Sequence, residues 1–191
     1  TTLFRSKNEM KDDLIVLQIG KKISKCYSYY TLQCDSTNST SEGRKKSQEL
    51  MIKAFREANG VIPKNFPHKK MRTIVYSNYP QNATTVTDGF SSSDFIYNDG
   101  ISLQKWCLLD STKLVLSYVC QKAECNFRGR KWTAWFALEI PVNNGPWKFG
   151  GLPGLIMEVY DVGKQYNFSI IGIEKCKNLP IVFSKATSKR Y

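Results

Sequence analysis

The feature that most constrains the fold is the aromatic-rich segment 130–140, whose side chains divide into two opposite sets when the chain is extended. Successive side chains of an extended chain point to opposite faces, so a period of two predicts a strand with one face in the core. One face would carry Trp132, Ala134, Phe136 and Leu138, and the other Thr133, Trp135, Ala137 and Glu139. We expect further strands at 113–121, 155–161 and 166–175, with residues 122–129 as a hairpin connection. Short strands joined by brief turns predict an antiparallel sheet.

The first half of the chain is less regular. Apolar or aromatic runs predict strands at 13–19, 26–32 and 71–79. Residues 35–43 are rich in Ser, Thr and Asn, so their composition predicts a polar loop. Residues 81–93 predict a loop or an exposed edge for the same reason.

Residues 44–59 form the one helix that the pattern predicts. Apolar residues recur at helical spacing, and Asn59-Gly60 supplies a stop signal. They are Leu50, Met51, Ala54, Phe55 and Ala58, and the charged residues lie largely on the other face. A basic amphipathic helix could lie on a membrane surface, but we expect it to pack on the sheet.

Together these elements predict one α+β domain over residues 1–191. A chain of 191 residues is long enough for a full hydrophobic core. The expected architecture is a mainly antiparallel, strongly curved β-sheet, like a half-barrel, with one amphipathic helix packed on it. Such a sheet would offer an apolar concave face to a ligand.

The six cysteines are candidates for disulfide bonds: Cys26, Cys34, Cys107, Cys120, Cys125 and Cys176. No Cys-x-x-Cys pair occurs and the single His68 lies far from every cysteine, which disfavours structural zinc. Bridges in an oxidising compartment are the better interpretation. Cys26 and Cys34 are a natural pair around the second predicted strand. A Cys120–Cys125 bridge across a turn and pairings to Cys107 or Cys176 are equally conceivable, so the connectivity stays open.

The net charge of +12 is accounted for by solubility alone, and it would also attract an anionic surface such as phosphate, anionic lipid headgroups or acidic glycans. It is +8 over residues 1–75, −2 over 76–127 and +6 over 128–191. Residues 128–136 depart from an aromatic RNA-binding strand because Arg130 replaces an aromatic residue, so we predict no specific nucleic-acid site. No apolar run reaches the length of a transmembrane helix, so we predict no transmembrane segment.

Catalytic signatures are missing from the sequence. It has no Gly-x-Ser-x-Gly elbow, and one histidine cannot form a His-Glu-x-x-His zinc motif. We therefore predict no catalytic residue, no cofactor and no metal, and we leave enzymatic activity open with a preference against it.

One segment is specific enough to suggest a family. Residues 151–156 read Gly-Leu-Pro-Gly-Leu-Ile, with Gly145-Pro146 upstream and Cys120-Gln121-Lys122-Ala123 in a preceding strand. Residues 17–20 and 28–30 match an opening segment of the same kind. The chain resembles the GLPGLI family, which comprises uncharacterised secreted proteins of Bacteroidetes, with a variable insert at about 35–100.

This resemblance implies an exported protein of the periplasm or outer membrane and no established reaction. It suggests an envelope protein or a TonB-dependent receptor as partner. Our leading hypothesis is non-catalytic binding of a ligand or envelope partner. The alternatives are a hydrolase acting on envelope peptide or glycan, and a structural module of a surface assembly.

The same segment supplies the candidate binding site. Gly145, Pro146, Gly151 and Gly154 predict a rigid corner between two strands, with Gly154 suited to a type II turn. The simpler interpretation is that this corner only connects the two strands. The functional alternative is that it forms a pocket rim or a partner surface, with Trp147 and Lys148 pointing outward as a recognition pair for a sugar or peptide. The candidate binding residues are Trp135, Trp147, Lys148, Phe149, Leu152 and Pro153.

Overall fold

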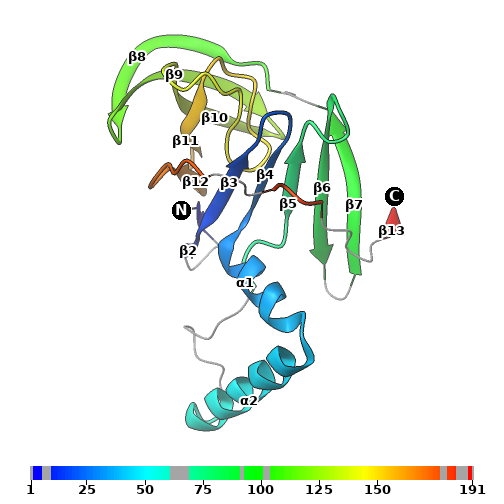
Figure 1. The fold of residues 1–191 in the computed structure, drawn as a ribbon. Helices are drawn as coiled ribbons and strands as arrows, with labels where there is room; N and C mark the ends of the chain where they lie inside the picture. Colours follow the sequence, from blue (N-terminus) through cyan, green and yellow to red (C-terminus); the bar gives the residue numbers. More distant parts are fainter. Residues whose placement is uncertain are drawn as a thin grey trace.

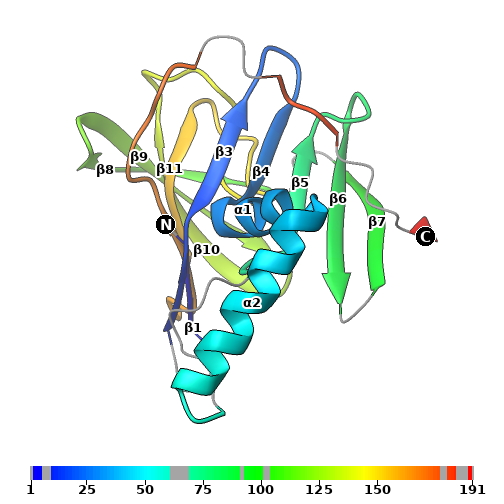
Figure 2. The same cartoon turned by 60° about the horizontal axis from the view of Figure 1, so that its bottom comes forward.

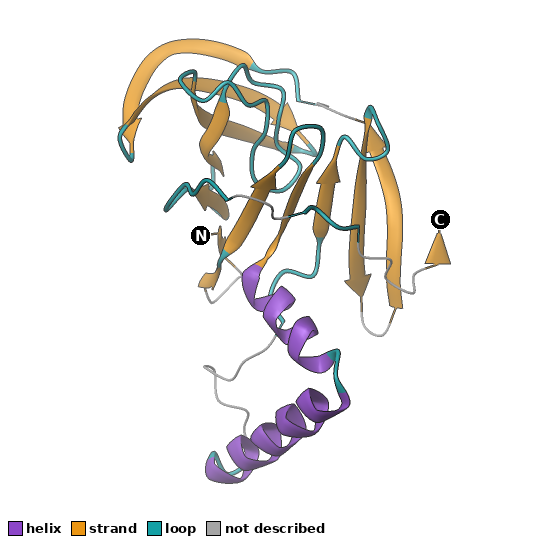
Figure 3. Ribbon diagram, in the orientation of Figure 1, coloured by secondary structure: helices purple, strands orange, loops and turns teal. Residues whose placement is uncertain are grey.

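The fold consists of two β-sheets with a pair of helices at one end, as seen in a computed structural model (Figures 1 and 3). The structure describes residues 2–5, 10–60, 69–90, 93–100, 104–176, 180–183 and 189–190. His68 lies outside these residues. The sheets are mainly antiparallel, which confirms the predicted strand arrangement in outline.

The first sheet has seven strands in the order β2-β1-β12-β11-β10-β9-β8. Its strands are β1 (Thr2–Arg5), β2 (Met10–Asp13), β8 (Cys107–Val115), β9 (Tyr118–Phe127), β10 (Arg130–Ala137), β11 (Leu155–Asp161) and β12 (Tyr166–Ser169). The expected strands at 155–161 and 130–140 are therefore present, the second ending three residues earlier.

The second sheet has six strands in the order β13-β7-β6-β5-β4-β3. They are β3 (Ile15–Ile19), β4 (Ser24–Ser28), β5 (Ile74–Ser77), β6 (Ala83–Phe90), β7 (Ser93–Gly100) and β13 (Lys189–Arg190). Within the described chain β13 runs parallel to β7, and the other pairs are antiparallel.

Three predictions about local structure are wrong. Residues 113–121 are a hairpin with its turn at 116–117, because Leu116 takes a positive φ of 53° between β8 and β9. Residues 122–127 continue β9, and the turn follows at Arg128 and Gly129. Residues 83–90 form β6, which pairs with β5 on one side and β7 on the other, and its threonines have a high β-propensity.

The helices also differ from the prediction. The structure contains α1 (Tyr29–Asn38) and α2 (Ser41–Glu57), so residues 29–38 are helical rather than strand and loop. The Ser28 hydroxyl caps α1 by accepting from the Thr31 N–H at 3.2 Å, which ends β4 and starts the helix. Helix α2 ends as expected, with Gly60 at a φ of 86°.

Helix α2 does not pack on a sheet, which corrects the expected architecture. None of its residues is buried, and its main contact is with α1 (Figures 1 and 2). The sheets are not closed into a barrel, and the half-barrel stays an interpretation. No helix in the described residues is long and apolar enough to cross a membrane.

The largest core cluster is aromatic and centred on Phe149. This ring packs against five others, with centroid distances from 4.6 Å to Trp132 up to 6.4 Å to Trp106. Ile15 and Trp147 contact both this cluster and the cluster of β4, β5 and β6. The two sheets thus share apolar contacts through these two side chains.

All six cysteines are free thiols in the structure. Of the pairings left open, a bridge between Cys120 and Cys125 is ruled out, because both lie on the one strand β9. Five residues of extended chain span about 16 Å, whereas a disulfide needs Cα atoms within about 7 Å. The two side chains also belong to separate buried clusters. The other pairings stay predictions.

Candidate functional site

The corner predicted from sequence is the segment between β10 and β11, residues 138–154. Gly154 is required for close approach, since a Cβ atom there would lie 2.1 Å from the Ala137 carbonyl oxygen. Gly145 is similarly restricted by Ile156 at 2.8 Å. The positive φ falls on Gly151, at 88°, so the expected left-handed position at Gly154 is wrong. The glycine requirement at Gly154 comes from packing.

Trp147 lies at the most constrained point of this corner. Its φ of 52° is unusual for a bulky residue and stores backbone strain. Its backbone N–H points at Cys26 of β4, with 3.1 Å between nitrogen and Sγ. Burial raises the pKa of the Cys26 thiol to about 12, although this same contact lowers it. The thiol therefore stays protonated at neutral pH.

Polar contacts tie the corner to β4 and to the segment that precedes β8. The Ser24 hydroxyl of β4 donates to Asn144 Oδ1 at 2.9 Å. The Gln104 amide donates to the Lys148 carbonyl at 3.0 Å, and Trp106 Nε1 donates to the Gly150 carbonyl at 2.8 Å. The Trp147 backbone is thus fixed on both sides along the chain.

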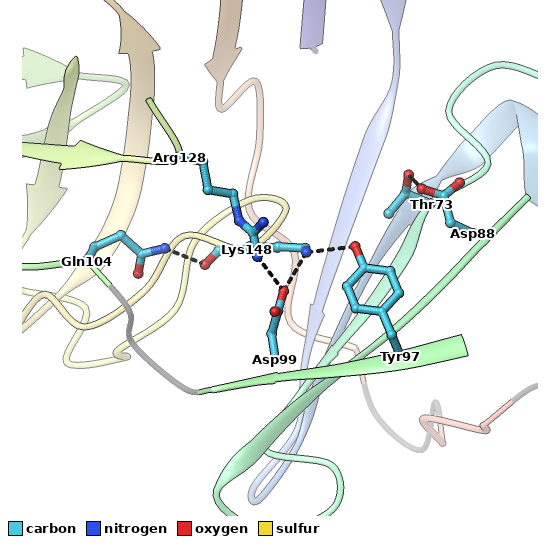
Figure 4. A network of polar contacts seen from close by, with 7 residues as sticks. All are labelled: Thr73, Asp88, Tyr97, Asp99, Gln104, Arg128 and Lys148. Atoms are coloured by element: carbon cyan, nitrogen blue, oxygen red, sulfur yellow. Dashed lines mark hydrogen bonds and ion pairs between the residues drawn. The ribbon is translucent and has the colours of Figure 1, made fainter. Parts of the chain in front are cut away.

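A charged network surrounds Lys148, the residue that follows Trp147 in the chain (Figure 4). Lys148 Nζ lies 2.6 Å from Asp99 Oδ2 and 2.8 Å from the Tyr97 hydroxyl, both on β7. Arg128 Nη2 donates to the same Asp99 oxygen at 2.8 Å. The Lys148 side chain is only 6% exposed, so the expectation that it points outward is wrong. It joins the corner to the second sheet instead.

The network also sets the charge of Asp99. Burial alone would raise the pKa of this carboxyl group. The hydrogen bonds and positive charges of Lys148 and Arg128 outweigh burial and hold the pKa below its usual value. Asp99 is therefore ionised at neutral pH and positions Arg128 at the edge of the neighbouring pocket.

That pocket has a volume of about 230 Å³ and is the best candidate functional site in the described chain. It is lined by Met71, Arg128, Arg130, Trp132, Trp147, Tyr166 and Phe168. Six of these seven side chains are aromatic or cationic. Its walls come from β10, β12, the β9–β10 turn and the corner, so the fold assembles it from distant parts of the sequence.

Arg130 is held in place on the pocket wall. Its guanidinium lies 4.7 Å from the centroid of the Tyr166 ring, and Nη1 donates to Asp161 Oδ2 and Gln165 Oε1, each at 2.8 Å. The side chain is 37% exposed. A guanidinium has five N–H donors, and the described contacts use only Nη1. Further donors on Arg130 are therefore available for a ligand.

The arrangement is suited to binding an anion attached to a ring. Guanidinium groups form paired hydrogen bonds with carboxylate or phosphate oxygens. The half-buried Trp147 ring offers flat apolar surface, whereas Trp132 is 3% exposed and contributes only the floor of the pocket. The Trp132 Nε1 donor is already used by the Phe127 carbonyl at 3.0 Å. The site can thus combine ionic recognition with stacking.

The structure brings together only part of the predicted binding set. Trp147 lines the pocket, whereas Phe149 and Leu152 are 3% and 1% exposed and belong to the core. Pro153 is exposed. Trp135 packs with a different cluster from Trp132 and lies under Lys113, whose Nζ is 4.5 Å from its ring centroid. The sequence alternation had placed Trp132 and Trp135 on opposite faces.

Several pocket residues were missed by the sequence reasoning. Arg128 and Arg130 flank a glycine between two strands, and such a spacing is a turn signal that could have placed both guanidinium groups at one hairpin end. No sequence pattern marks Tyr166 or Met71 as pocket residues, because their proximity to the arginines depends on the order of the strands in the sheets. Within the described residues no cluster of three or more His, Cys, Asp or Glu side chains could hold a metal ion.

Comparison with known proteins supports the fold and leaves the function open. A family model described as "Protein of unknown function (Porph_ging)" matches residues 126–158, which include the β9–β10 turn and the corner. No curated protein sequence matches the chain. The resemblance of the sequence to the GLPGLI family therefore stays a prediction.

Two solved structures of PNGF-II are similar in fold. In the P21 space group the TM-score is 0.61 at 13% identity, over 100% of this chain and 30% of that chain. In the C2 space group the TM-score is 0.59 at 12% identity, over 94% of this chain and 27% of that chain. The chain thus spans less than a third of PNGF-II, and the similarity concerns the fold alone.

Proposed function

We propose that this chain binds a small anionic, ring-containing ligand, without catalysing a reaction on it, in the pocket formed by Arg128, Arg130, Trp132 and Trp147. The observation that carries the proposal is the placement of two guanidinium groups beside aromatic walls in one pocket of about 230 Å³. A carboxylate on a sugar or on an aromatic ring has this combination of charge and flat apolar surface.

The preference for binding over catalysis rests on the chemistry beside the pocket. Cys26 holds the Trp147 backbone, and its pKa of about 12 leaves no thiolate to act as a nucleophile. Asp99 is engaged by Lys148 and Arg128, and its lowered pKa makes it a poor proton donor. Both groups support the positions of pocket residues.

We extend the proposal to location and partners. The resemblance to secreted GLPGLI proteins favours an exported protein of the cell envelope, with a TonB-dependent receptor or another envelope protein as partner. We also propose that the sheets are curved and act as a half-barrel whose ligand-binding part is the pocket. Fractionation of the source organism would test the location, and recovery only in the cytoplasm would contradict it.

Fluorescence titration tests ligand binding, because Trp132 and Trp147 both line the pocket. Sodium glucuronate and sodium phenylacetate are the anionic probes, and glucose and 2-phenylethanol are their uncharged counterparts. We expect at least one anion to change the emission saturably and its counterpart to bind at least about tenfold more weakly, since a charged hydrogen bond is lost.

Two neighbouring residues provide matched variants. Arg130→Gln removes a pocket cation, whereas Lys131→Gln removes a cation whose side chain points to the opposite face of β10 and pairs with Glu124. Arg130→Gln should lower the affinity for the anionic probe about tenfold, and Lys131→Gln should change this affinity less than twofold. Equal effects of the two substitutions, or no saturable binding of either anion, would refute the proposal.

A further inference from the structure

Helix α2 exposes a surface that the pocket does not use. None of its 17 residues is buried. Its large apolar side chains are about half exposed, at 49% for Leu50, 43% for Met51, 52% for Ile52 and 49% for Phe55. A surface helix of a folded protein normally turns such side chains toward the core, so this arrangement indicates an external binding partner.

The apolar and charged side chains are segregated around the helix. At 100° per residue, Leu50, Ala54, Met51 and Phe55 follow one another within an arc of 140°. Ile52 lies 60° beyond Phe55 at the border of this apolar face. The charged residues between 45 and 57 lie across the remaining arc: Lys45, Lys46, Glu49, Lys53, Arg56 and Glu57. Arg44 lies on the apolar side, more than one turn before Leu50.

The charge of α2 favours an anionic partner. The helix carries five basic residues, Arg44, Lys45, Lys46, Lys53 and Arg56, against three acidic ones, Glu42, Glu49 and Glu57. Two copies of this helix would repel each other, whereas an anionic surface attracts it. Helices with Lys and Arg beside an apolar face that contains Phe and Leu bind at the boundary of lipid headgroups and acyl chains.

The apolar side chains of α2 are accessible in part, since Leu50, Met51 and Phe55 are each about half exposed. The helix lies beyond one end of both sheets, joined to them through α1 (Figure 1). We propose that α2 docks on an anionic lipid surface, with Leu50, Met51 and Phe55 in the headgroup–acyl boundary and Lys46, Lys53 and Arg56 at the phosphates. This docking is independent of the proposed pocket.

Vesicle co-sedimentation tests the proposal. The probes are vesicles of phosphatidylcholine with 30% phosphatidylglycerol and vesicles of phosphatidylcholine alone. We expect the protein to bind the anionic vesicles and Leu50→Ser/Phe55→Ser to lower the partition coefficient at least about tenfold, because less apolar area is buried. Removing three cations with Lys46→Gln/Lys53→Gln/Arg56→Gln should weaken binding by more than tenfold.

Matched controls separate docking by α2 from general attraction of a basic protein. Leu114→Ser/Val162→Ser changes two side chains that are 70% and 68% exposed outside α2. Lys105→Gln/Lys131→Gln/Lys164→Gln removes the same number of charges from other exposed lysines. We expect the first control to change partitioning less than twofold and the second to weaken it less than the α2 charge variant.

Hydrogen exchange gives a second, local measurement. Bound anionic vesicles should protect the amides of residues 41–57 more than those of β6, whatever the stability of each variant. The proposal is refuted if the wild type does not sediment with anionic vesicles, or if the control sets weaken binding as much as the α2 sets. A lipid-independent dimer that Leu50→Ser/Phe55→Ser dissociates would also refute it and assign the face to a second copy.

Discussion

At the scale of single residues, the contact between Cys26 and Trp147 joins β4 to the strained corner. The Cys26 side chain is 2% exposed, and its Sγ accepts the Trp147 N–H. A sulfur in this position matters for two reasons. It satisfies a backbone donor in a left-handed conformation, and it is a titratable group that folding keeps protonated.

This buried thiol predicts a loss of stability in alkali. The ordinary pKa is 9.0, and burial raises the pKa of Cys26 to about 12. Between these values the unfolded chain has released the proton while the folded chain retains it, so the stability is present below pH 9 and falls as pH rises. Each such thiol contributes a slope of about 1.4 kcal/mol per pH unit.

The measurement is urea unfolding of wild type and Cys26→Ala at pH 7.5 and pH 10.5. The substitution removes the titrating group, so the variant should lose about 1–2 kcal/mol less than the wild type between the two pH values. Its lower stability at pH 7.5, from the lost packing, cancels in this difference. Parallel pH dependence of the two proteins would contradict the assignment of a raised pKa to Cys26.

At the level of residues, the sequence correctly predicted which side chains of one strand share a face. It did not predict the orientation of side chains in the corner. The alternation in residues 130–140 correctly separated Trp132 from Trp135, because strand periodicity is local. The orientation of Lys148 was wrong, since its partners Asp99 and Tyr97 lie about 50 residues away and no local pattern contains them. The Arg128 and Arg130 site depends on the same kind of distant pairing.

At the scale of elements, the corner between β10 and β11 depends on glycine for close packing. The hypothetical Cβ of Gly154 falls 2.1 Å from the Ala137 carbonyl oxygen, which belongs to the backbone and cannot turn away. The Cβ of Gly145 would meet the side chain of Ile156 at 2.8 Å. Gly172 has nothing within 4 Å.

These three environments predict a graded series of Gly→Ala substitutions. Gly154→Ala should destabilise the fold by about 3 kcal/mol or more, because the corner must shift. Gly145→Ala should cost roughly 1–3 kcal/mol, since Ile156 can move, and Gly172→Ala should stay within about 0.5 kcal/mol. Chemical unfolding measures each value, and soluble yield replaces it if Gly154→Ala does not fold. A Gly154→Ala protein as stable as Gly172→Ala would show that close packing does not explain this glycine.

Sequence periodicity identified several of the strands and one helix. Residues 15–19, 74–77, 130–137 and 155–161 carry apolar runs that predicted their strands. Helix α1 was missed because its tyrosines continue the apparent alternation of β4, and the decisive signal is the single cap at Ser28. The α2 pattern was recognised, but amphipathicity does not specify what covers the apolar face.

At the scale of the whole molecule, Phe149 is the ring on which the aromatic core converges. It contacts Trp132, Phe127 and Phe168 of the first sheet, and Trp147, which also packs against β4, β5 and β6. Phe149 is 3% exposed and comes from the corner rather than from either sheet. Its loss should therefore weaken both sheets together.

Phe149→Ala should destabilise the protein by about 3–5 kcal/mol, which is typical of removing a buried phenylalanine. The matched control is Phe55→Ala on α2, where half of the side chain is already exposed, and it should cost at most about 0.5 kcal/mol. Far-ultraviolet circular dichroism and tryptophan fluorescence should report the same midpoint in each variant. Separate transitions in Phe149→Ala would mean that the corner does not couple the sheets.

The overall architecture was predictable in class and only partly in arrangement. Mainly antiparallel pairing follows from short alternating strands, whatever their order. The division into two sheets follows from pairings such as Cys26 with Val75 and β12 with β1, which join distant segments. The net charge of +12 indicated an anionic partner but not where on the protein it would bind. The structure locates basic side chains in the pocket and on α2.

The helical pair has a consequence for how the chain can vary. The chain leaves the second sheet at Ser28 and re-enters it at Ile74, in strands that are direct neighbours, with Cys26 opposite Val75. The two ends of the segment between β4 and β5 therefore lie as close together as the ends of a simple hairpin loop. Insertions, deletions or a different peripheral module could replace the helices while the ladder between β4 and β5 is retained, so this position allows the periphery to diversify without redesign of the core.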